Sequence, residues 1–220
     1  MSKTFWAVIA IIVIVFGGII IFNNHKSGSS SSNAKPTNHV EGSTKTGVTL
    51  VEYGDYECPY CGAYHPTVKQ VATKYADRIQ FQFRNLPLLQ VHQNALSSAK
   101  AAEAAGLQGK FWQMHDMLYE SQSSWSSSSN AASIFEQYAA QLSLNVAQFK
   151  QDYASDAVNN TITADINAFL KTGNEESTPT FFLDGKKVQP ANTVTSFSSL
   201  IDAEIAKKAK TTSQSTSSTN

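Results

Sequence analysis

The only two cysteines of this 220-residue chain lie close together, in the tetrapeptide Cys58-Pro59-Tyr60-Cys61. Residues 48–53 (VTLVEY), just before it, are mostly β-branched or aromatic, which predicts a β-strand. After Pro59, apolar residues recur at three- and four-residue spacing, which predicts a helix. Two cysteines are too few for a disulfide-stapled miniature fold or for a zinc site built on four cysteines. The fold must therefore hold a dithiol at the junction of a strand and a helix.

This junction gives the two sulfurs different chemistry. Pro59 suits the first helical position, where its fixed φ fits and its missing N–H is not needed. Cys58 then lies at the helix N-terminus, where unpaired N–H groups and the helix dipole favour a thiolate. Cys61 lies one turn further along, where it can attack a mixed disulfide formed on Cys58. We therefore predict that Cys58 is the nucleophile and Cys61 the resolving cysteine, with their own disulfide as the redox group and no other cofactor or metal.

Apolar patterns along the rest of the chain predict a mixed α/β domain. Residues 79–83 alternate apolar and polar side chains, as a second strand does. Several helical stripes follow between about residues 92 and 173. Residues 180–189 then predict a hairpin around an Asp184-Gly185 turn, and an amphipathic helix closes the domain. This order of elements indicates a helical subdomain inserted into an α/β core.

Two motifs far apart in the sequence carry a family resemblance. The segment VEYGDYECPYC, which ends at Cys61, and the segment STPTFF at residues 177–182 together resemble the thioredoxin superfamily. The helical block between them is similar to that of DsbA-like thiol:disulfide oxidoreductases of the membrane-anchored bacterial type. The resemblance covers residues 47–208 and implies a thioredoxin-like core with an inserted helical subdomain. It also implies thiol–disulfide exchange with exported proteins that contain cysteines.

The same resemblance implies a substrate site around Thr178 and Pro179. In the family the corresponding peptide bond is cis and lies beside the nucleophilic cysteine, although the sequence by itself favours a trans proline that opens a strand. Thr178 would offer backbone hydrogen bonds to an extended substrate chain, as in strand addition. Pro59 and Tyr60 would shape the surface next to it.

The residues between the cysteines leave the direction of electron flow open. The strongest DsbA-type oxidants carry Pro-His at these positions, whereas this chain carries Pro-Tyr, and Tyr60 stabilises a thiolate less than a histidine does. Potentials of such dithiols run from about −270 to about −120 mV, and we expect an intermediate value. An oxidant that forms disulfides is the favoured function. A reductase or isomerase of the same fold is the first alternative, and a Cu(I)-binding dithiol is the second.

Other polar residues near the dithiol have weaker assignments. Glu57 is a candidate proton relay, although a solvated loop charge is the simpler interpretation. His65, one turn further along the predicted helix than the second cysteine, is expected to be an exposed helix residue. His92 and His115 show no informative spacing from the cysteines.

Residues 5–22 form an uninterrupted apolar run. Eighteen helical residues span roughly 27 Å, close to the thickness of the hydrocarbon core of a bilayer. The run is longer than the apolar region of a signal peptide, and no small-residue cleavage site follows it, so we expect an uncleaved single-pass anchor. Lysines are nearly balanced on its two sides, but oxidative exchange belongs outside the cytosol. We therefore expect residues 1–4 in the cytoplasm and the catalytic domain on the outer side of the cell membrane.

Polar segments flank the predicted domain. Residues 23–46 and 209–220 carry few apolar side chains and are expected to be a disordered linker and a disordered tail. The 17 basic and 17 acidic residues balance, which argues against binding of nucleic acid through a basic surface. The expected partners are exported proteins, the membrane and, by the family resemblance, a quinone-linked membrane oxidase of the DsbB or VKOR type.

Overall fold

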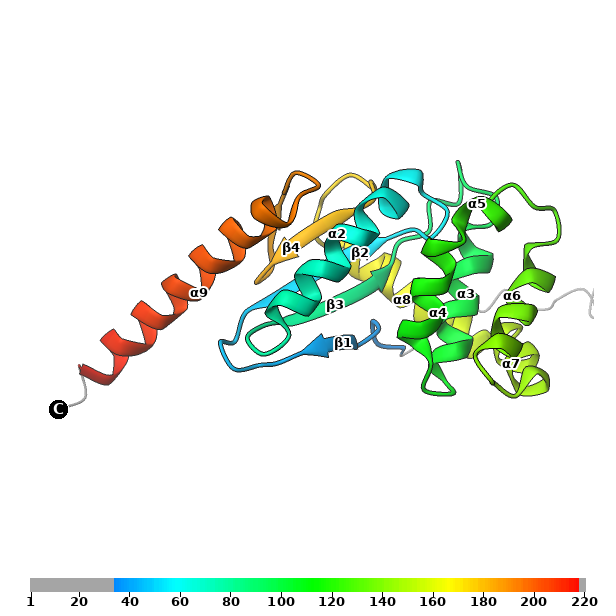
Figure 1. Cartoon of the computed structure of the whole chain (residues 1–220), viewed down its shortest axis with the longest axis horizontal. Helices are drawn as coiled ribbons and strands as arrows, with labels where there is room; N and C mark the ends of the chain where they lie inside the picture. The colour runs from blue at the N-terminus through cyan, green and yellow to red at the C-terminus, as the bar shows by residue number, and fades with distance from the viewer. Residues whose placement is uncertain (1–33, 218–220) are drawn as a thin grey trace, which may run out of the picture. The chain divides into compact units, whose positions relative to one another are not determined.

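A computed structural model describes residues 34–217 of the chain. The expected anchor at residues 5–22, residues 1–4 and the first part of the expected linker lie outside the described residues. In chain order the elements are β1 (His39–Gly42), β2 (Thr49–Gly54), α2 (Pro59–Tyr75), β3 (Gln80–Asn85), α3 (Ala95–Gly106), α4 (Phe111–Glu120), α5 (Gln122–Trp125), α6 (Ala131–Gln141), α7 (Val146–Tyr153), α8 (Asp156–Leu170), β4 (Thr180–Leu183), β5 (Lys186–Val188) and α9 (Val194–Ser217) (Figure 1). Within these elements, none of the helices is both long and apolar enough to cross a membrane.

The five strands form one mixed sheet in the order β1-β3-β2-β4-β5. Strand β2 lies at its centre, parallel to β3 and antiparallel to β4, with Tyr53 opposite Thr180. Because β2 and β4 run in opposite directions, the end of β2 meets the beginning of β4 at the same edge of the sheet. The segment just before β4, which holds Thr178 and Pro179, is thereby brought beside the loop that leads from β2 to the dithiol.

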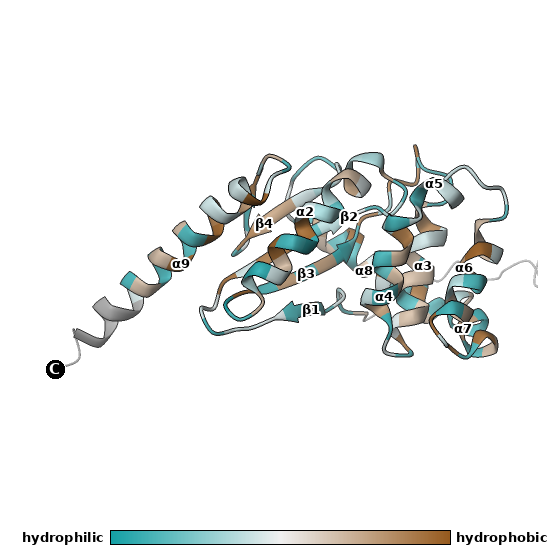
Figure 2. Ribbon diagram, in the orientation of Figure 1, coloured by the Kyte–Doolittle hydropathy of each residue, from teal (hydrophilic) through white to brown (hydrophobic). Residues whose placement is uncertain are grey.

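Helices cover both faces of the sheet. On one face, Leu50 and Phe181 pack with Val71 of α2 and Ile201 of α9. On the other face, α8 contributes Phe169 to a second cluster with residues of β2 and β4. Strand β4 (TFFL) is buried along its whole length and is mostly hydrophobic (Figure 2). Burial on both faces explains why this strand is a continuous apolar run instead of an alternating one.

The expected helical subdomain is confirmed between β3 and β4. The alanine-rich helix α3 lies at its centre and contacts α4, α6, α7 and α8. Its core surrounds Trp125 and Phe135, which are fully buried, and Trp125 Nε1 donates a hydrogen bond of 2.9 Å to the Leu118 carbonyl. Phe83 of β3 and Tyr56 of the active-site loop belong to the same cluster. The subdomain therefore shares its core with the sheet at the position of the dithiol.

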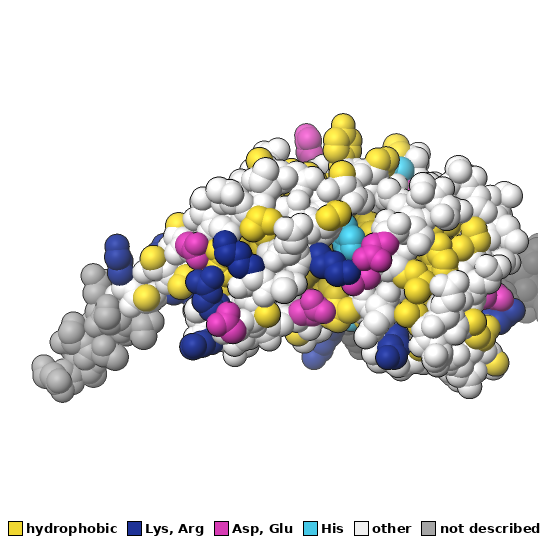
Figure 3. Space-filling view, viewed as in Figure 1, with side chains coloured by type: hydrophobic (Ala, Val, Ile, Leu, Met, Phe, Trp, Pro, Cys, Tyr) yellow, Lys and Arg dark blue, Asp and Glu magenta, His cyan; other side chains and the backbone are white. Residues whose placement is uncertain are grey.

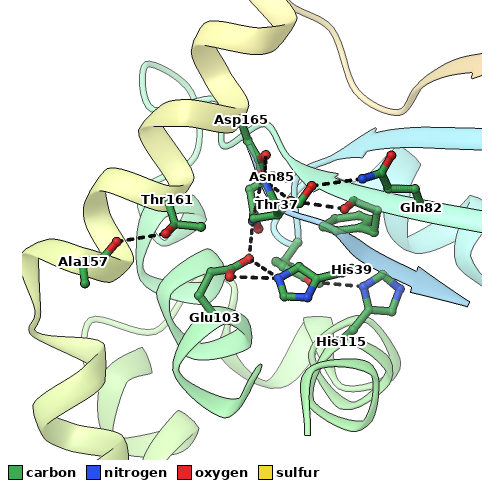
Figure 4. A network of polar contacts seen from close by, with 11 residues as sticks. Thr37, His39, Gln82, Asn85, Glu103, His115, Ala157, Thr161 and Asp165 are labelled. Atoms are coloured by element: carbon green, nitrogen blue, oxygen red, sulfur yellow. Dashed lines mark hydrogen bonds and ion pairs between the residues drawn. The ribbon is translucent and has the colours of Figure 1, made fainter. Parts of the chain in front are cut away.

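The prediction of a disordered linker is wrong for residues 34–46. Residues 39–42 form β1, which pairs with β3. Just before it, Thr37 is buried and donates from its backbone N and its Oγ1 to the Asp165 carboxylate, at 2.7 and 2.8 Å (Figure 4). His39 lies 2.9 Å from Glu103 and stacks on a phenylalanine of α4. This segment is ordered by partners far away in the sequence, which its own polar composition does not reveal.

The prediction of a disordered tail from residue 209 is also wrong in part, because α9 continues to Ser217. Extending a helix that has already formed adds one hydrogen bond for each residue fixed, so residues of modest helix propensity can follow. Thr211 Oγ1 donates to the Lys207 carbonyl at 3.2 Å, as threonines inside helices often do.

The space-filling view shows basic and acidic side chains interspersed on the face that it presents (Figure 3).

Candidate active site

Cys58 occupies the position immediately before helix α2, as expected. Its backbone is extended (φ −64°, ψ 121°), and Pro59 is the first helical residue. The Cys58 carbonyl accepts the first helical hydrogen bond, from Gly62 N at 3.1 Å. Cys58 is 4% exposed, Cys61 is fully buried, and both are free thiols. The local sequence therefore places the first sulfur at the positive end of the helix dipole and the second sulfur inside the core.

Hydrogen bonding makes Cys58 acidic. The largest cause is the Cys61 thiol, which donates a hydrogen bond to the Cys58 sulfur. Thr178 and the backbone N–H groups of Cys61 and Tyr60 act in the same direction, whereas burial opposes them. Together these effects lower the pKa of Cys58 to about 5. At pH 7 this pKa corresponds to about a hundred thiolates for each thiol. Cys58 is therefore ready to attack a disulfide and is a good leaving group.

Cys61 has the opposite character. Burial, followed by the hydrogen bond with Cys58, raises the pKa of Cys61 well above its ordinary value. It remains a thiol at neutral pH and needs a base before it can attack. The asymmetry between nucleophile and resolving cysteine that the sequence predicts thus has a physical cause in the surroundings of each sulfur.

Thr178 and Pro179 lie beside the nucleophile. The peptide bond between them is cis, which confirms the expectation from the resemblance. The Thr178 carbonyl oxygen lies 3.4 Å from Cys58 Sγ. Next to this contact is a cavity of about 290 Å³, lined in part by Tyr60, Tyr64 and Pro179. Tyr60 is 73% exposed, so it stands at the rim of the site, where an incoming protein chain can reach it.

Asp55 organises the loop between β2 and Cys58. This residue is buried, and its Oδ1 accepts a hydrogen bond from Glu57 N at 2.8 Å. Its Oδ2 accepts from Leu88 N at 2.9 Å and lies 2.7 Å from His92 Nδ1. His92 is therefore a partner of this loop, which spacing in the sequence did not indicate.

Two further side chains hold the loop from the helical subdomain. The Glu57 carboxylate accepts a hydrogen bond from Asn94 N, at the start of α3. Gln122 of α5 donates from Nε2 to the carbonyl oxygens of Tyr56 and Cys58, at 2.6 and 2.9 Å. Glu57 is engaged with the start of α3, and its assignment as a proton relay stays a prediction.

Glu52 is the acidic group that lies near the sulfurs. It is 2% exposed in the central strand, and burial, followed by the negative charge of Cys58, raises its pKa to about 8. Its charge in turn raises the pKa of Cys61. A neutral carboxyl group at pH 7 can give a proton to a leaving thiolate and take it back later. In the sequence, the signal that could have identified Glu52 was a charged residue within an otherwise apolar predicted strand.

The expectation that His65 is exposed is wrong. Its side chain is 6% exposed and stacks on Tyr119, with ring centroids 5.0 Å apart. Helix α4 of the inserted subdomain covers this side of α2 and also brings His115 to within 5.4 Å of His65, centroid to centroid. Such a contact between distant segments leaves no trace in the spacing around His65.

This arrangement supports thiol–disulfide exchange. It provides an ionised nucleophile, a protonated resolving thiol, a buried acid near both, and a backbone carbonyl at the rim beside the nucleophile. These are the parts that a thiol:disulfide oxidoreductase needs to form a mixed disulfide and resolve it.

Comparisons with known proteins identify the sequence family of this chain. The sequence family described as "Thioredoxin" matches residues 34–203. Among curated relatives, the Na(+)/H(+) antiporter NhaA 1 of Salinispora arenicola is 36% identical over 169 residues, 77% of this chain and 25% of the antiporter. The Na(+)/H(+) antiporter NhaA 3 of Salinispora tropica is 37% identical over 150 residues, 68% of this chain and 22% of the antiporter. The chain thus spans about a quarter of the length of these relatives.

Solved structures share the fold. Oxidised BdbD from Bacillus subtilis superposes with a TM-score of 0.65 at 21% identity, covering 80% of this chain and 97% of that one. Wolbachia pipientis alpha-DsbA1 gives a TM-score of 0.69 at 20% identity, covering 80% and 96%. A thioredoxin-like oxidoreductase from Silicibacter pomeroyi gives 0.62 at 24% identity, covering 76% and 91%. With its DsbA-like helical insertion and its matched sequence family, the chain belongs to the thioredoxin superfamily.

Proposed function

We propose that this protein is a membrane-anchored thiol:disulfide oxidoreductase that introduces disulfides into exported proteins. The observation that carries the proposal is the strongly acidic Cys58, with a pKa of about 5, at the start of α2 and beside the Thr178 carbonyl. A thiolate that is stable in the reduced protein favours the dithiol over the disulfide, so the Cys58–Cys61 disulfide tends to take electrons from substrates.

The proposed reaction begins with the oxidised protein. A substrate thiolate attacks Cys58 Sγ, the bond between Cys58 and Cys61 breaks, and Cys61 leaves as a thiolate that takes up a proton. A second substrate thiolate then attacks the substrate sulfur of the mixed disulfide, and Cys58 leaves as a stable thiolate. The substrate loses two electrons and gains a disulfide, while the protein gains two electrons and becomes the dithiol.

Glu52 is the proposed proton donor for Cys61. Burial, the larger cause of its raised pKa, acts in both redox states and favours the protonated acid, while the pKa of Cys61 lies well above its ordinary value. Proton transfer from Glu52 to the leaving thiolate is therefore downhill, and a proton taken up later from bulk solvent restores the acid. In the reverse direction the ionised Glu52 accepts the proton from Cys61 before Cys61 attacks.

Substrate binding is proposed at the surface around the cis bond. The Thr178 carbonyl and the exposed Tyr60 ring flank Cys58, and the cavity next to them extends along Val188 and Pro190. An extended peptide bound here would be held mainly through its backbone, with little dependence on its sequence. Such binding fits an enzyme that acts on many exported proteins.

The reduction potential distinguishes this function from its alternative. The Cys58 pKa of about 5 lies between the values of about 7 for thioredoxin and about 3.5 for DsbA. We therefore expect a potential roughly midway between about −270 and −120 mV, measured by equilibration of the full-length protein with glutathione buffers. A potential at or below that of thioredoxin would contradict the oxidant function and support a reductase.

The proposed location is the cell membrane, with the catalytic domain on its outer side. The apolar run at residues 5–22 supports an anchor, and a quinone-linked membrane oxidase of the DsbB or VKOR type is the proposed partner that restores the disulfide. We expect the full-length protein to remain in the membrane pellet after carbonate extraction, whereas a chain that begins at Ala34 should be released. Recovery of a mature protein cleaved between residues 23 and 34 would show a signal peptide instead.

A further inference from the structure

A cavity of about 210 Å³ lies on the side of the domain where α2, α4 and β1 meet. Its lining includes His65 and Lys69 of α2, His115 and Asp116 of α4, and Glu41 of β1. The space-filling view shows a histidine surface flanked by basic and acidic side chains in the region of α2 and α4 (Figure 3). The proposed exchange reaction uses none of these residues.

Three ligand-type atoms converge in this cavity. One nitrogen from each of His65 and His115 and one carboxylate oxygen of Asp116 lie within 4.8 Å of one another. His65 Nε2 is buried and has no hydrogen-bond partner within the described part of the chain. A buried polar atom without a partner is costly, and a ligand that accepts its lone pair would remove that cost.

One pair of these atoms already has the separation found around a metal ion, and the third, which lies within 4.8 Å of them, would move inward on binding. His65 Nε2 lies 3.5 Å from Asp116 Oδ1. Two ligands of a tetrahedral zinc ion with bonds of 2.0–2.1 Å are about 3.4 Å apart, so this pair needs almost no movement. Two imidazoles and one carboxylate are a donor set that zinc and related divalent transition metals accept, with the fourth position left to water.

Neighbouring groups hold the ligands in the required orientation. His115 Nδ1 lies 3.0 Å from Tyr56 Oη, which leaves Nε2 of His115 available to a metal. Lys69 Nζ binds Asp116 Oδ2 at 2.7 Å and Glu120 at 2.9 Å, which leaves Asp116 Oδ1 available. Such outer contacts fix the tautomer and direction of metal ligands.

We propose that His65, His115 and Asp116 form a binding site for one divalent transition-metal ion of the zinc type. The ion would join α2, which carries the dithiol, to α4 of the inserted subdomain. The site is separate from Cys58 and Cys61, and its existence does not depend on the direction of the exchange reaction.

Zinc titration of the full-length protein in detergent tests this site. The protein is first stripped with a chelator and oxidised, so that the disulfide prevents Cys58 and Cys61 from binding metal. Calorimetry should then detect one zinc ion per chain, and the melting temperature should rise with zinc concentration because the ion binds the folded state. His65→Gln and Asp116→Asn each remove a direct ligand and should weaken binding by at least the roughly 10- to 100-fold that loss of an outer contact costs.

Glu136→Gln is the matched control, because Glu136 of α6 also pairs with a lysine, Lys150, but does not line this cavity. It should leave the zinc affinity unchanged. Cobalt provides a second measurement, since its visible absorption reports a four-coordinate site and should be lost in both ligand variants. Asp116 is partly exposed, so its variant keeps the test available if His65→Gln does not fold. Absence of saturable binding, or unchanged affinity in either correctly folded ligand variant, would overturn the proposal.

Discussion

Replacing Cys58 with serine is expected to abolish thiol–disulfide exchange. The serine hydroxyl cannot form the mixed disulfide, and buried Cys61, whose pKa is raised well above its ordinary value, cannot take its place. Cys61→Ser should instead retain attack by Cys58 and accumulate long-lived mixed disulfides, because the resolving sulfur is missing. The adducts are counted by non-reducing electrophoresis and mass spectrometry of the purified variants.

A comparison of two replacements at Cys61 tests the cause of the acidity. Serine retains a donor to the Cys58 sulfur, whereas alanine removes the hydrogen bond that contributes most to lowering the pKa of Cys58. The pKa of Cys58, followed by the ultraviolet absorbance of its thiolate, should therefore be higher in Cys61→Ala than in Cys61→Ser. Adducts that form through Cys61 in the Cys58→Ser variant would contradict the assigned order of the two cysteines.

The features predicted correctly from sequence depend on local chemistry. Pro59 begins α2 because its ring suits the first helical turn, and this alone places Cys58 at the helix N-terminus. The strand before it and the helical insertion after β3 follow from apolar periodicity. The cis bond before Pro179 is different, because local sequence favours trans and only the family resemblance indicated the observed geometry.

The features that sequence did not reveal depend on contacts between distant segments. The polar composition of residues 34–46 predicts a disordered linker, but Thr37 binds the buried carboxylate of Asp165, which lies 128 positions away. His65 is buried only because α4 packs over α2. Glu57 is bound to the start of α3 for a similar reason. In each case a polar side chain is satisfied by a partner that no periodic pattern identifies.

Glu52→Gln is expected to stabilise the reduced protein in a manner that depends on pH. The folded state holds the proton of Glu52 up to a pKa of about 8, whereas an unfolded chain releases it near the ordinary value of 4.5. Between these two values the folded state binds more protons than the unfolded state, so the free energy of unfolding falls as the pH rises. Below pH 4.5 the carboxyl group is neutral in both states and has no such cost.

Glutamine is neutral at every pH and resembles the protonated acid in shape, so the variant should escape this loss. The difference in unfolding free energy should be small at pH 4, grow between pH 4.5 and 8, and level off at about 3–5 kcal/mol above pH 8. Urea unfolding of the reduced full-length proteins across this range measures it. Oxidation removes the Cys58 charge, the second cause of the raised pKa of Glu52, so the same comparison on oxidised protein should give a smaller difference in unfolding free energy.

The Glu52→Gln variant should also resolve mixed disulfides more slowly, because Cys61 loses its proton acceptor. Parallel pH profiles for the two proteins, with unchanged resolution rates, would remove Glu52 from the mechanism.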